Sequence, residues 1–420
     1  MSDSAFCTRP RPAARWSGAV LALACASVLA GAVVAGALPT GAGTPAHAAR
    51  PLPASGTDAR ATRGQVDREE LARVAAAAAA GGKSGAQAAG KVVGRSGDRW
   101  SAVYDEAGYA RFEEALDGAY TGVGISARRD RSGRVEVARL HPGGPAERAG
   151  LRPGDRIRAV DGRPVQGLPV AEVVARLRGD ARDAAPGTPV TLGVQRDGRG
   201  WTTTLRRARL VTDPVTVQRL DDGAVRITVA EFTRGAGQRV RDAVRTAPAG
   251  AGVLLDLRGN GGGLVTEAVA AASAFLDGGL VATYDVHGEE QALYAQPGGD
   301  TGRPLVALVD GGTMSAAELL AGALQDRGRA VTVGGRTFGK GSVQLPSRLP
   351  DGSVAELTVG HYRTPAGRGV DGEGLTPDVA ATPTASGPAA DPDAPPTAAD
   401  PVETRARAVL SGLGGPDPEP

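Results

Sequence analysis

The chain has 420 residues, enough for two or three folded domains, and a formal net charge of +2 at pH 7. This near-balance argues against the clustered basic surface that nucleic-acid binding requires, so no nucleic-acid partner is expected. The chain has two cysteines, Cys7 and Cys25, both near its start. Once that segment is removed, no disulfide, cysteine nucleophile or thiolate-bound metal is available.

The N-terminus has the layout of an export signal. Arginines precede an uncharged apolar run at residues 18–38, and small residues follow it as far as Ala48. Residues 1–49 are therefore predicted to be an export signal or a membrane anchor, because a run of about 21 residues can also span a bilayer. Two locations stay open: the secreted or cell-wall space after cleavage near Ala48, or the outer face of the cytoplasmic membrane.

The segments that follow differ in composition and predicted secondary structure, which indicates several domains. Residues 50–64 are a polar linker, and a helical N-terminal region is expected at 65–119, with helices from Asp67 to Ala80 and from Asp105 to Leu116. Residues 120–210 combine short β-rich pieces with one helix at 170–177. This change of character marks a second domain.

A layered α/β core is predicted at 211–382. Strands at 253–257, 305–309 and 331–333 alternate there with helices at 266–276 and 315–325. Residues 383–420 are rich in proline and alanine and are predicted to be a disordered tail, with a short helix at 403–410.

Two motifs in the second domain resemble a PDZ domain. The segment YTGVGI at 120–125 is similar to its carboxylate-binding loop, and PAERAGLRPGDRIRAVDGRPV at 145–165 to its small helix, turn and strand. The loop positions are then Gly122, Val123, Gly124 and Ile125. Glycines let backbone N–H groups converge on a chain-terminal carboxylate, while an extended peptide adds to the strand edge. The first motif alone would favour a tight turn without a ligand, and the second motif is what favours the PDZ interpretation.

A glycine run at 259–263 connects an apolar strand to a helix in VLLDLRGNGGGLVTEAV. A dinucleotide-binding fingerprint would need glycine at position 264, where Leu264 stands. Two interpretations remain, a plain tight turn or a loop that aims backbone N–H groups at developing negative charge.

Ser315 begins a helix in GGTMSAAELLAGALQD, directly after a buried strand. With Glu318 three residues later it fits a capping box. A hydroxyl at the positive end of a helix is also where nucleophiles lie, and the next N–H, from Ala316, can then bind an oxyanion.

Lys340 lies in the glycine-rich stretch GGRTFGKGSVQLP, whose spacing resembles a phosphate-binding loop. Gly341 stands where that loop needs Ser or Thr, and a short β-forming run closed by Pro346 follows in place of a helix. The pattern therefore predicts strand, turn and strand. Lys340 is then either a solvated lysine at a hairpin tip or a proton acceptor.

Taken together in this order, from about Tyr104 to Val379, the motifs resemble the C-terminal processing proteases, serine endopeptidases of the S41 type. The resemblance implies that Ser315 is the nucleophile, that Lys340, 25 residues later, is its general base, and that Gln344 orients the lysine. The implied oxyanion donors are the N–H groups of Gly262 and Ala316. A lysine can accept the serine proton only in its neutral form.

The implied fold is a multidomain α/β protein, with a ClpP/crotonase-like protease core and an inserted PDZ domain. The implied function is an exported endopeptidase that needs no cofactor or metal and acts on proteins with apolar C-terminal tails. An exported PDZ scaffold that binds such tails without cutting them is the alternative. Among the four histidines, His361 is the one plausible imidazole base, but we expect it to be a histidine packed on a strand. The sequence contains no G-x-S-x-G or H-E-x-x-H motif.

Overall fold

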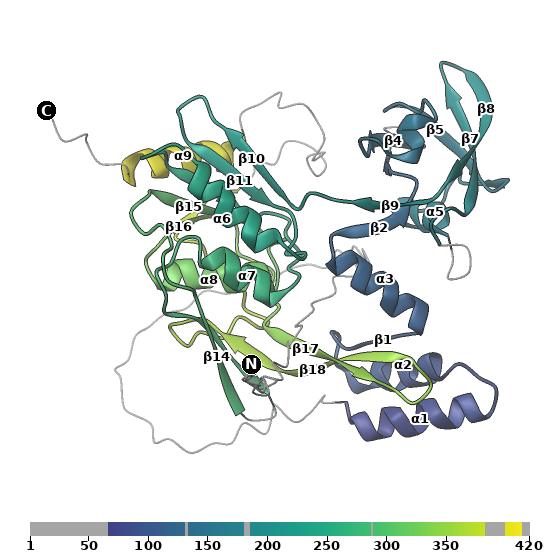
Figure 1. Ribbon diagram of the computed structural model, residues 1–420, viewed down its shortest axis with the longest axis horizontal. Helices are drawn as coiled ribbons and strands as arrows, with labels where there is room; N and C mark the ends of the chain where they lie inside the picture. The colour runs from purple at the N-terminus through teal and green to yellow at the C-terminus, as the bar shows by residue number, and fades with distance from the viewer. Residues whose placement is uncertain (1–65, 131–132, 180–184, 287–288, 383–399, 414–420) are drawn as a thin grey trace, which may run out of the picture.

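The computed structural model in Figure 1 describes residues 66–130, 133–179, 185–286, 289–382 and 400–413. The predicted export segment at 1–49, the linker at 50–64 and residues 383–399 and 414–420 of the predicted tail lie outside these ranges. Among the helices of the described ranges, none combines the length and the apolar character needed to cross a bilayer.

A six-stranded sheet forms the centre of the C-terminal half. Its strand order is β10 (Val215–Arg219), β11 (Val225–Val229), β12 (Val253–Asp256), β15 (Leu305–Val309), β16 (Val331–Gly334) and β19 (Val379–Ala380). All neighbouring pairs are parallel except β10 with β11. Because the carboxyl ends of the parallel strands share one edge, the loops after β12, β15 and β16 meet there, and these loops carry the three glycine-rich motifs.

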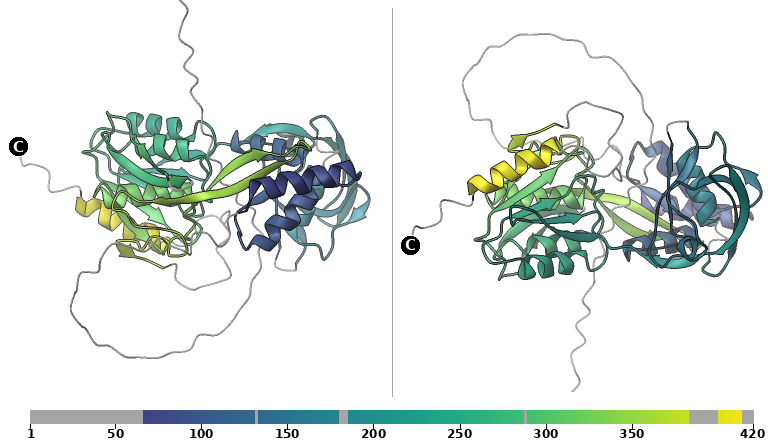
Figure 2. Two further views of the ribbon diagram at one scale, coloured as in Figure 1. Left: turned by 90° about the horizontal axis from the view of Figure 1, so that it is seen from below. Right: turned by 90° about the horizontal axis from the view of Figure 1, so that it is seen from above.

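Helices cover both faces of this sheet. Val253 and Leu255 of β12 pack with α6 (Ala236–Thr246), α7 (Val265–Ala272) and α8 (Ala316–Asp326), while Leu254 packs with α9 (Pro401–Leu413) on the other face. Figure 2 shows α9 and α6 on opposite sides of the sheet. Strands buried on both faces are largely apolar, and Asp256 is the one charged residue in the runs at 253–257 and 305–309, so both runs were predictable as buried strands.

A second sheet reaches from the core towards the N-terminal helices. It contains β1 (Ala102–Tyr104), β18 (Val354–Arg363), β13 (Leu280–Val286) and β14 (Glu289–Tyr294) in that order, with β17 (Ser342–Arg348) also pairing with β18. The helices α1 (Arg68–Ala80) and α2 (Gly85–Ser96) pack on the β17–β18 hairpin through Leu71, Ala89 and Leu357. The N-terminal helices are thereby held on the far half of the hairpin that follows the turn carrying Lys340.

The PDZ-like domain follows α3 (Glu106–Leu116) and is joined to the rest of the chain by the paired strands β2 (Ala119–Gly122) and β9 (Ala208–Val211). Its sheet has the order β3 (Ile125–Arg129), β4 (Val135–Leu140), β5 (Arg156–Val160), β7 (Pro189–Arg196) and β8 (Arg199–Arg206), with β6 (Arg163–Pro164) on β5. The helices are α4 (Pro145–Arg148) and α5 (Val170–Arg178). Its own apolar cluster includes Val137, Leu192 and Val173.

The predicted fold class is confirmed, because the chain has an α/β layered core and an inserted, mostly β domain. Two parts differ from expectation. The helix expected at 403–410 is longer and packs on the sheet as α9, so residues 400–413 are not part of a disordered tail. The helix α2 was not predicted, because glycines at 85, 90 and 94 weaken its propensity.

Candidate active site

Ser315 immediately precedes α8 at the carboxyl edge of the central sheet, and it is 1% exposed. Its backbone has a φ of 55° and a ψ of −118°, a conformation that a residue other than glycine rarely adopts. Strain of this kind persists only where surrounding contacts enforce it, and it concentrates at active sites. The contacts that enforce it here come from a buried carboxylate.

The carboxylate of Glu318 binds both halves of the candidate site. Its Oε2 accepts hydrogen bonds from the backbone N–H groups of Ser315 and Lys340, each at 2.9 Å. Its Oε1 accepts from the Gly339 N–H at 2.8 Å and from the Thr337 hydroxyl at 2.5 Å. Because Oε2 accepts from both nitrogens at 2.9 Å, the backbone nitrogens of Ser315 and Lys340 are separated by no more than twice 2.9 Å.

Burial raises the pKa of Glu318 above its ordinary value, against four hydrogen bonds that favour the ionised form. The sequence pointed to Glu318 only as a capping residue. In the structure, the Glu318 carboxylate accepts four hydrogen bonds. One comes from the Ser315 N–H, and the other three come from the turn that carries Lys340. Capping-box spacing was the signal that could have found this residue, but its role in the lysine turn depends on a contact across 22 positions.

Lys340 lies in the turn between β16 and β17, as the strand, turn and strand pattern predicted, and no helix follows it. It is 1% exposed, so it is not a solvated hairpin lysine. Gly339 has a φ of 90°, and a Cβ there would lie 2.9 Å from the Gly374 nitrogen, which explains the need for glycine at that position. The turn is also tied to the serine loop, because the Phe338 N–H donates to the Thr313 carbonyl at 3.0 Å.

The amine of Lys340 lies over the ring of Trp100, 4.7 Å from its centre. The Trp100 ring in turn packs edge-on against Phe338, with ring centres 5.9 Å apart. Within the described ranges, no hydrogen bond joins the Lys340 amine to the Ser315 hydroxyl. The structure therefore brings the two backbones together but directs the amine at an aromatic face, and no pattern in the sequence pointed to Trp100.

Gln344 lies on β17 and is 2% exposed. Its Nε2 donates to the hydroxyls of Ser342 at 2.9 Å and Thr358 at 3.2 Å, while its Oε1 is buried and has no partner among the described residues. Gln344 thus shares the buried pocket with the lysine turn but does not hydrogen-bond the Lys340 amine. Its role in orienting the lysine stays a prediction.

The predicted oxyanion donors lie next to the candidate nucleophile. A Cβ at Gly262 would lie 3.0 Å from the Ser315 Cβ and 3.3 Å from the Ala316 nitrogen, so the two loops are in contact. Ala316 is the first residue of α8, and no earlier carbonyl of that helix can accept its N–H. The Gly262 N–H, however, donates to Asn260 Oδ1 at 2.8 Å, so in this arrangement it is already engaged.

The predicted PDZ loop, Gly122 to Ile125, connects the stem strand β2 to β3. Gly124 has a φ of 78°, and its carbonyl accepts from the His141 N–H at 2.9 Å, while the Val123 carbonyl accepts from the Ala146 N–H at 2.9 Å. In the described part of the domain, β3 is at the end of the sheet order and α5 lies beside it. An edge strand beside a helix is the geometry that accepts an added peptide strand.

His361 is on β18, with its side chain 55% exposed and its Nε2 3.7 Å from Asp371 Oδ2. It was expected to pack within the sheet, but it points outward, and it is not among the groups around Ser315. In the described ranges, no three acidic, histidine or cysteine side chains are grouped so that they could hold a metal ion. The groups described around Ser315 are its own hydroxyl, the Lys340 turn, the Glu318 carboxylate and backbone N–H groups.

Two segments of the chain match known families. Residues 223–381 match the sequence profile described as "Peptidase family S41", and residues 136–196 match that of the PDZ domain. The chain belongs to peptidase family S41. This S41 chain is similar to the "Carboxy-terminal processing protease CtpA" of Bacillus subtilis (strain 168), with 31% identity over 289 residues, which cover 68% of the chain and 61% of the relative.

It is also similar to the "C-terminal processing peptidase, chloroplastic" of Tetradesmus obliquus, with 36% identity over 300 residues, covering 64% of the chain and 62% of the relative. The S41 chain thus spans about three fifths of the length of these curated relatives. A solved structure described as "Photosystem II D1 C-terminal processing protease" has 31% sequence identity and a TM-score of 0.47, and the match covers 71% of this chain and 82% of that one.

Proposed function

We propose that this protein is an exported serine endopeptidase of the C-terminal processing type, with Ser315 as nucleophile and Lys340 as general base. The observation that carries the proposal is the shared carboxylate of Glu318. It fixes the backbones of two residues that are 25 positions apart and almost fully buried, and each has a side chain suited to one half of a Ser–Lys site.

The reaction would begin with attack of the Ser315 hydroxyl on a peptide carbonyl, while the neutral Lys340 amine takes the hydroxyl proton. The Lys340 amine must first turn from Trp100 towards Ser315, a side-chain rotation that leaves the Glu318 contacts in place. The oxyanion would be bound by the Ala316 N–H, and by the Gly262 N–H once it leaves Asn260. Lys340 would then give the proton to the leaving amine, and water would hydrolyse the acyl-enzyme.

Substrates would be proteins with apolar C-terminal tails. The terminal carboxylate would lie at the loop Gly122 to Ile125, and the tail would extend the PDZ sheet at β3. The N-terminal pattern at 18–38 supports a location outside the cytoplasm, either released or attached to the outer face of the cytoplasmic membrane. The competing function is a tail-binding scaffold without activity. It is favoured by one observation, the amine of Lys340 facing Trp100 and not Ser315.

Mass spectrometry of an unfolded test protein with an apolar C-terminus tests the proposal. The wild-type protein should produce fragments, and Ser315→Ala and Lys340→Ala should not. The chain offers a matched control, because its only other lysines, Lys83 and Lys91, are both exposed, so Lys91→Ala should cut like wild type. A substrate that binds but stays intact would establish the scaffold, and cutting by Lys340→Ala would place the base elsewhere.

A further inference from the structure

The helix α9 lies beyond residues 223–381, which match the peptidase family, yet it is built into the catalytic domain. Val402, Ala406 and Leu410 are buried against Leu254, Val306, Leu308 and Val333 of the central sheet. Figures 1 and 2 show α9 lying on the face of that sheet opposite α6. Its N-terminal end is directed at the edge where the strand β12 runs into the loop 257–263.

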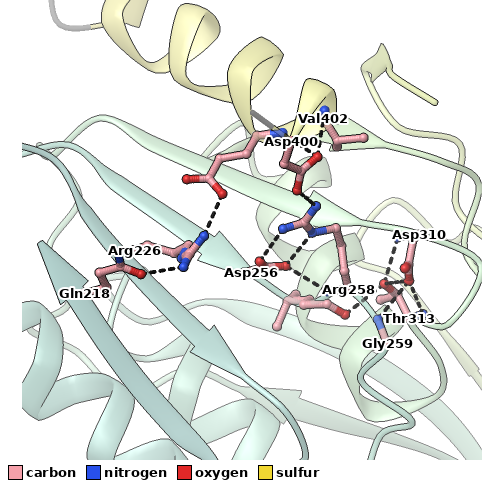
Figure 3. A network of polar contacts seen from close by, with 11 residues as sticks. Gln218, Arg226, Asp256, Arg258, Gly259, Asp310, Thr313, Asp400 and Val402 are labelled. Atoms are coloured by element: carbon pink, nitrogen blue, oxygen red, sulfur yellow. Dashed lines mark hydrogen bonds and ion pairs between the residues drawn. The ribbon is translucent and has the colours of Figure 1, made fainter. Parts of the chain in front are cut away.

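Asp400, the residue before α9, uses its two carboxylate oxygens for different purposes. Its Oδ1 accepts from the N–H groups of Val402 at 2.9 Å and Glu403 at 3.3 Å, which caps the helix. Its Oδ2 accepts from Nη1 of Arg258. The other side of that guanidinium donates to Asp256, from Nε at 2.8 Å and from Nη2 at 2.7 Å. Figure 3 shows Arg258 bracketed by these two carboxylates.

The neighbours of Arg258 are bonded to the loop that leads to Ser315. The Leu257 carbonyl accepts from the Thr313 hydroxyl at 2.9 Å. The Gly259 N–H donates to Asp310 Oδ1 at 2.9 Å, and the same oxygen accepts from the Thr313 N–H at 3.1 Å. The contacts from Arg258 through Gly259 to Asp310 and Thr313 can be followed in Figure 3. They end two residues before Ser315 on one loop and three before Gly262 on the other.

We propose that Asp400 is a positioning residue. Through Arg258 it fixes the two loops that carry the oxyanion donor and the nucleophile, so that docking of the C-terminal helix is a condition for catalysis. Any effect on turnover rests on the proposed protease function, whereas the fixing of the loops does not. The bidentate contact to Asp256 orients the guanidinium, and the Asp400 contact closes its remaining side. The same helix has a second ion pair, Arg407 to Asp222 at 2.8 Å, which touches neither loop.

Two variants of the full chain separate positioning from simple anchoring of the helix. Asp400→Asn keeps the capping oxygen and removes the charge that faces Arg258. Arg407→Gln removes an ion pair of the same helix elsewhere. Hydrogen–deuterium exchange of the segments 257–264 and 310–316 is the direct measurement. We expect the exchange to become at least about tenfold faster in Asp400→Asn and to stay as in wild type in Arg407→Gln, with α9 itself equally protected in both.

Kinetics on the unfolded test protein give the catalytic consequence. Asp400→Asn should lower kcat about tenfold with KM unchanged, Asp400→Glu should recover most of it, and Arg407→Gln should match wild type. Unchanged loop exchange in Asp400→Asn, or equal changes in both variants, would overturn the inference. If the wild-type protein cuts nothing, the proposed function fails, and the exchange measurement still decides whether Asp400 fixes the loops.

Discussion

Glu356 is a buried acid whose removal should stabilise the protein in a pH-dependent way. It lies on β18 opposite Ala102 of β1 and Pro346 of β17, and it is 2% exposed. Neither of its carboxylate oxygens has a hydrogen-bond partner in the described part of the chain. Burial raises the pKa of Glu356 to about 7, with a smaller opposing effect from Lys340 and a smaller contribution from Glu113.

The sign of the effect follows from linkage. The folded chain binds the Glu356 proton more tightly than the unfolded chain does, since the pKa is about 7 when folded and 4.5 ordinarily. Stability from this group is complete below a pH of 4.5 and is lost as the pH rises through 7. At about 1.4 kcal/mol per pKa unit, the difference corresponds to roughly 3 kcal/mol lost between these limits.

Glu356→Gln removes the ionisable group and keeps the shape of the protonated acid. The free energy of unfolding of the variant should therefore equal that of wild type near pH 4.5 and exceed it by up to roughly 3 kcal/mol at pH 8.5. Urea unfolding at several pH values measures this, with Trp100 as the fluorescent reporter of this part of the fold. The substitutions Trp16→Phe and Trp201→Phe in both proteins leave Trp100 as the one remaining tryptophan of the chain.

Glu290→Gln, an exposed acid on β14, is the matched control and should change stability at no pH. A gain of equal size at every pH would refute the reasoning, because it would not come from ionisation. A loss of stability at pH 8.5 would refute it more strongly. In that case the ionised Glu356 would be paired with the charged Lys340 amine, and burial would not dominate.

Three further substitutions test the contacts around the site. Glu318→Gln replaces one acceptor oxygen by an NH₂ group, so two of four donors lose their acceptor, and urea unfolding at pH 7 should show a loss of about 3 kcal/mol. Gly262→Ala needs a φ of 101° and puts a Cβ 3.0 Å from that of Ser315, so kcat should fall on the order of 100-fold. Trp100→Leu removes the ring over the Lys340 amine and should lower the free energy of unfolding by about 2 kcal/mol; no change would mean that the amine is solvated.

The parts of the site that the sequence predicted are those set by local geometry. A buried parallel strand is largely apolar, and the turn at its end needs glycines or a helix cap, so Gly262, Ser315 and Lys340 could each be placed at a strand end. The 25-residue spacing between Ser315 and Lys340 then matched a known family. The carboxyl edge of one parallel sheet brings these turns together without any long-range information beyond the strand order.

The parts that were not predicted depend on contacts between distant segments. Trp100 reaches Lys340 because β1 pairs with β18, and Asp400 reaches Arg258 because α9 packs on the sheet. Neither residue lies in a pattern that marks it, since one is a single aromatic after a helix and the other ends a proline-rich stretch. Glu356 is a buried acid on β18, whereas the alternation of apolar and polar residues along that strand would have predicted an exposed side chain.

The backbones of Ser315 and Lys340 are held firmly, whereas the Lys340 amine and the Gly262 N–H are held weakly. Four hydrogen bonds to Glu318 fix the chain at Ser315 and Lys340, while the Lys340 amine has one contact with an aromatic face, which is worth about 2 kcal/mol when the amine is charged and desolvated and less when it is neutral. The Gly262 N–H has one hydrogen bond to Asn260, worth about 1 kcal/mol net. The free energy needed to redirect both groups is therefore at most about 3 kcal/mol. A peptide that binds with a micromolar Kd has a binding free energy of about 8 kcal/mol, which is larger. Catalytic contacts commonly tighten only once substrate is bound, and the Glu318 contacts to the Ser315 and Lys340 backbones can stay in place while they do so.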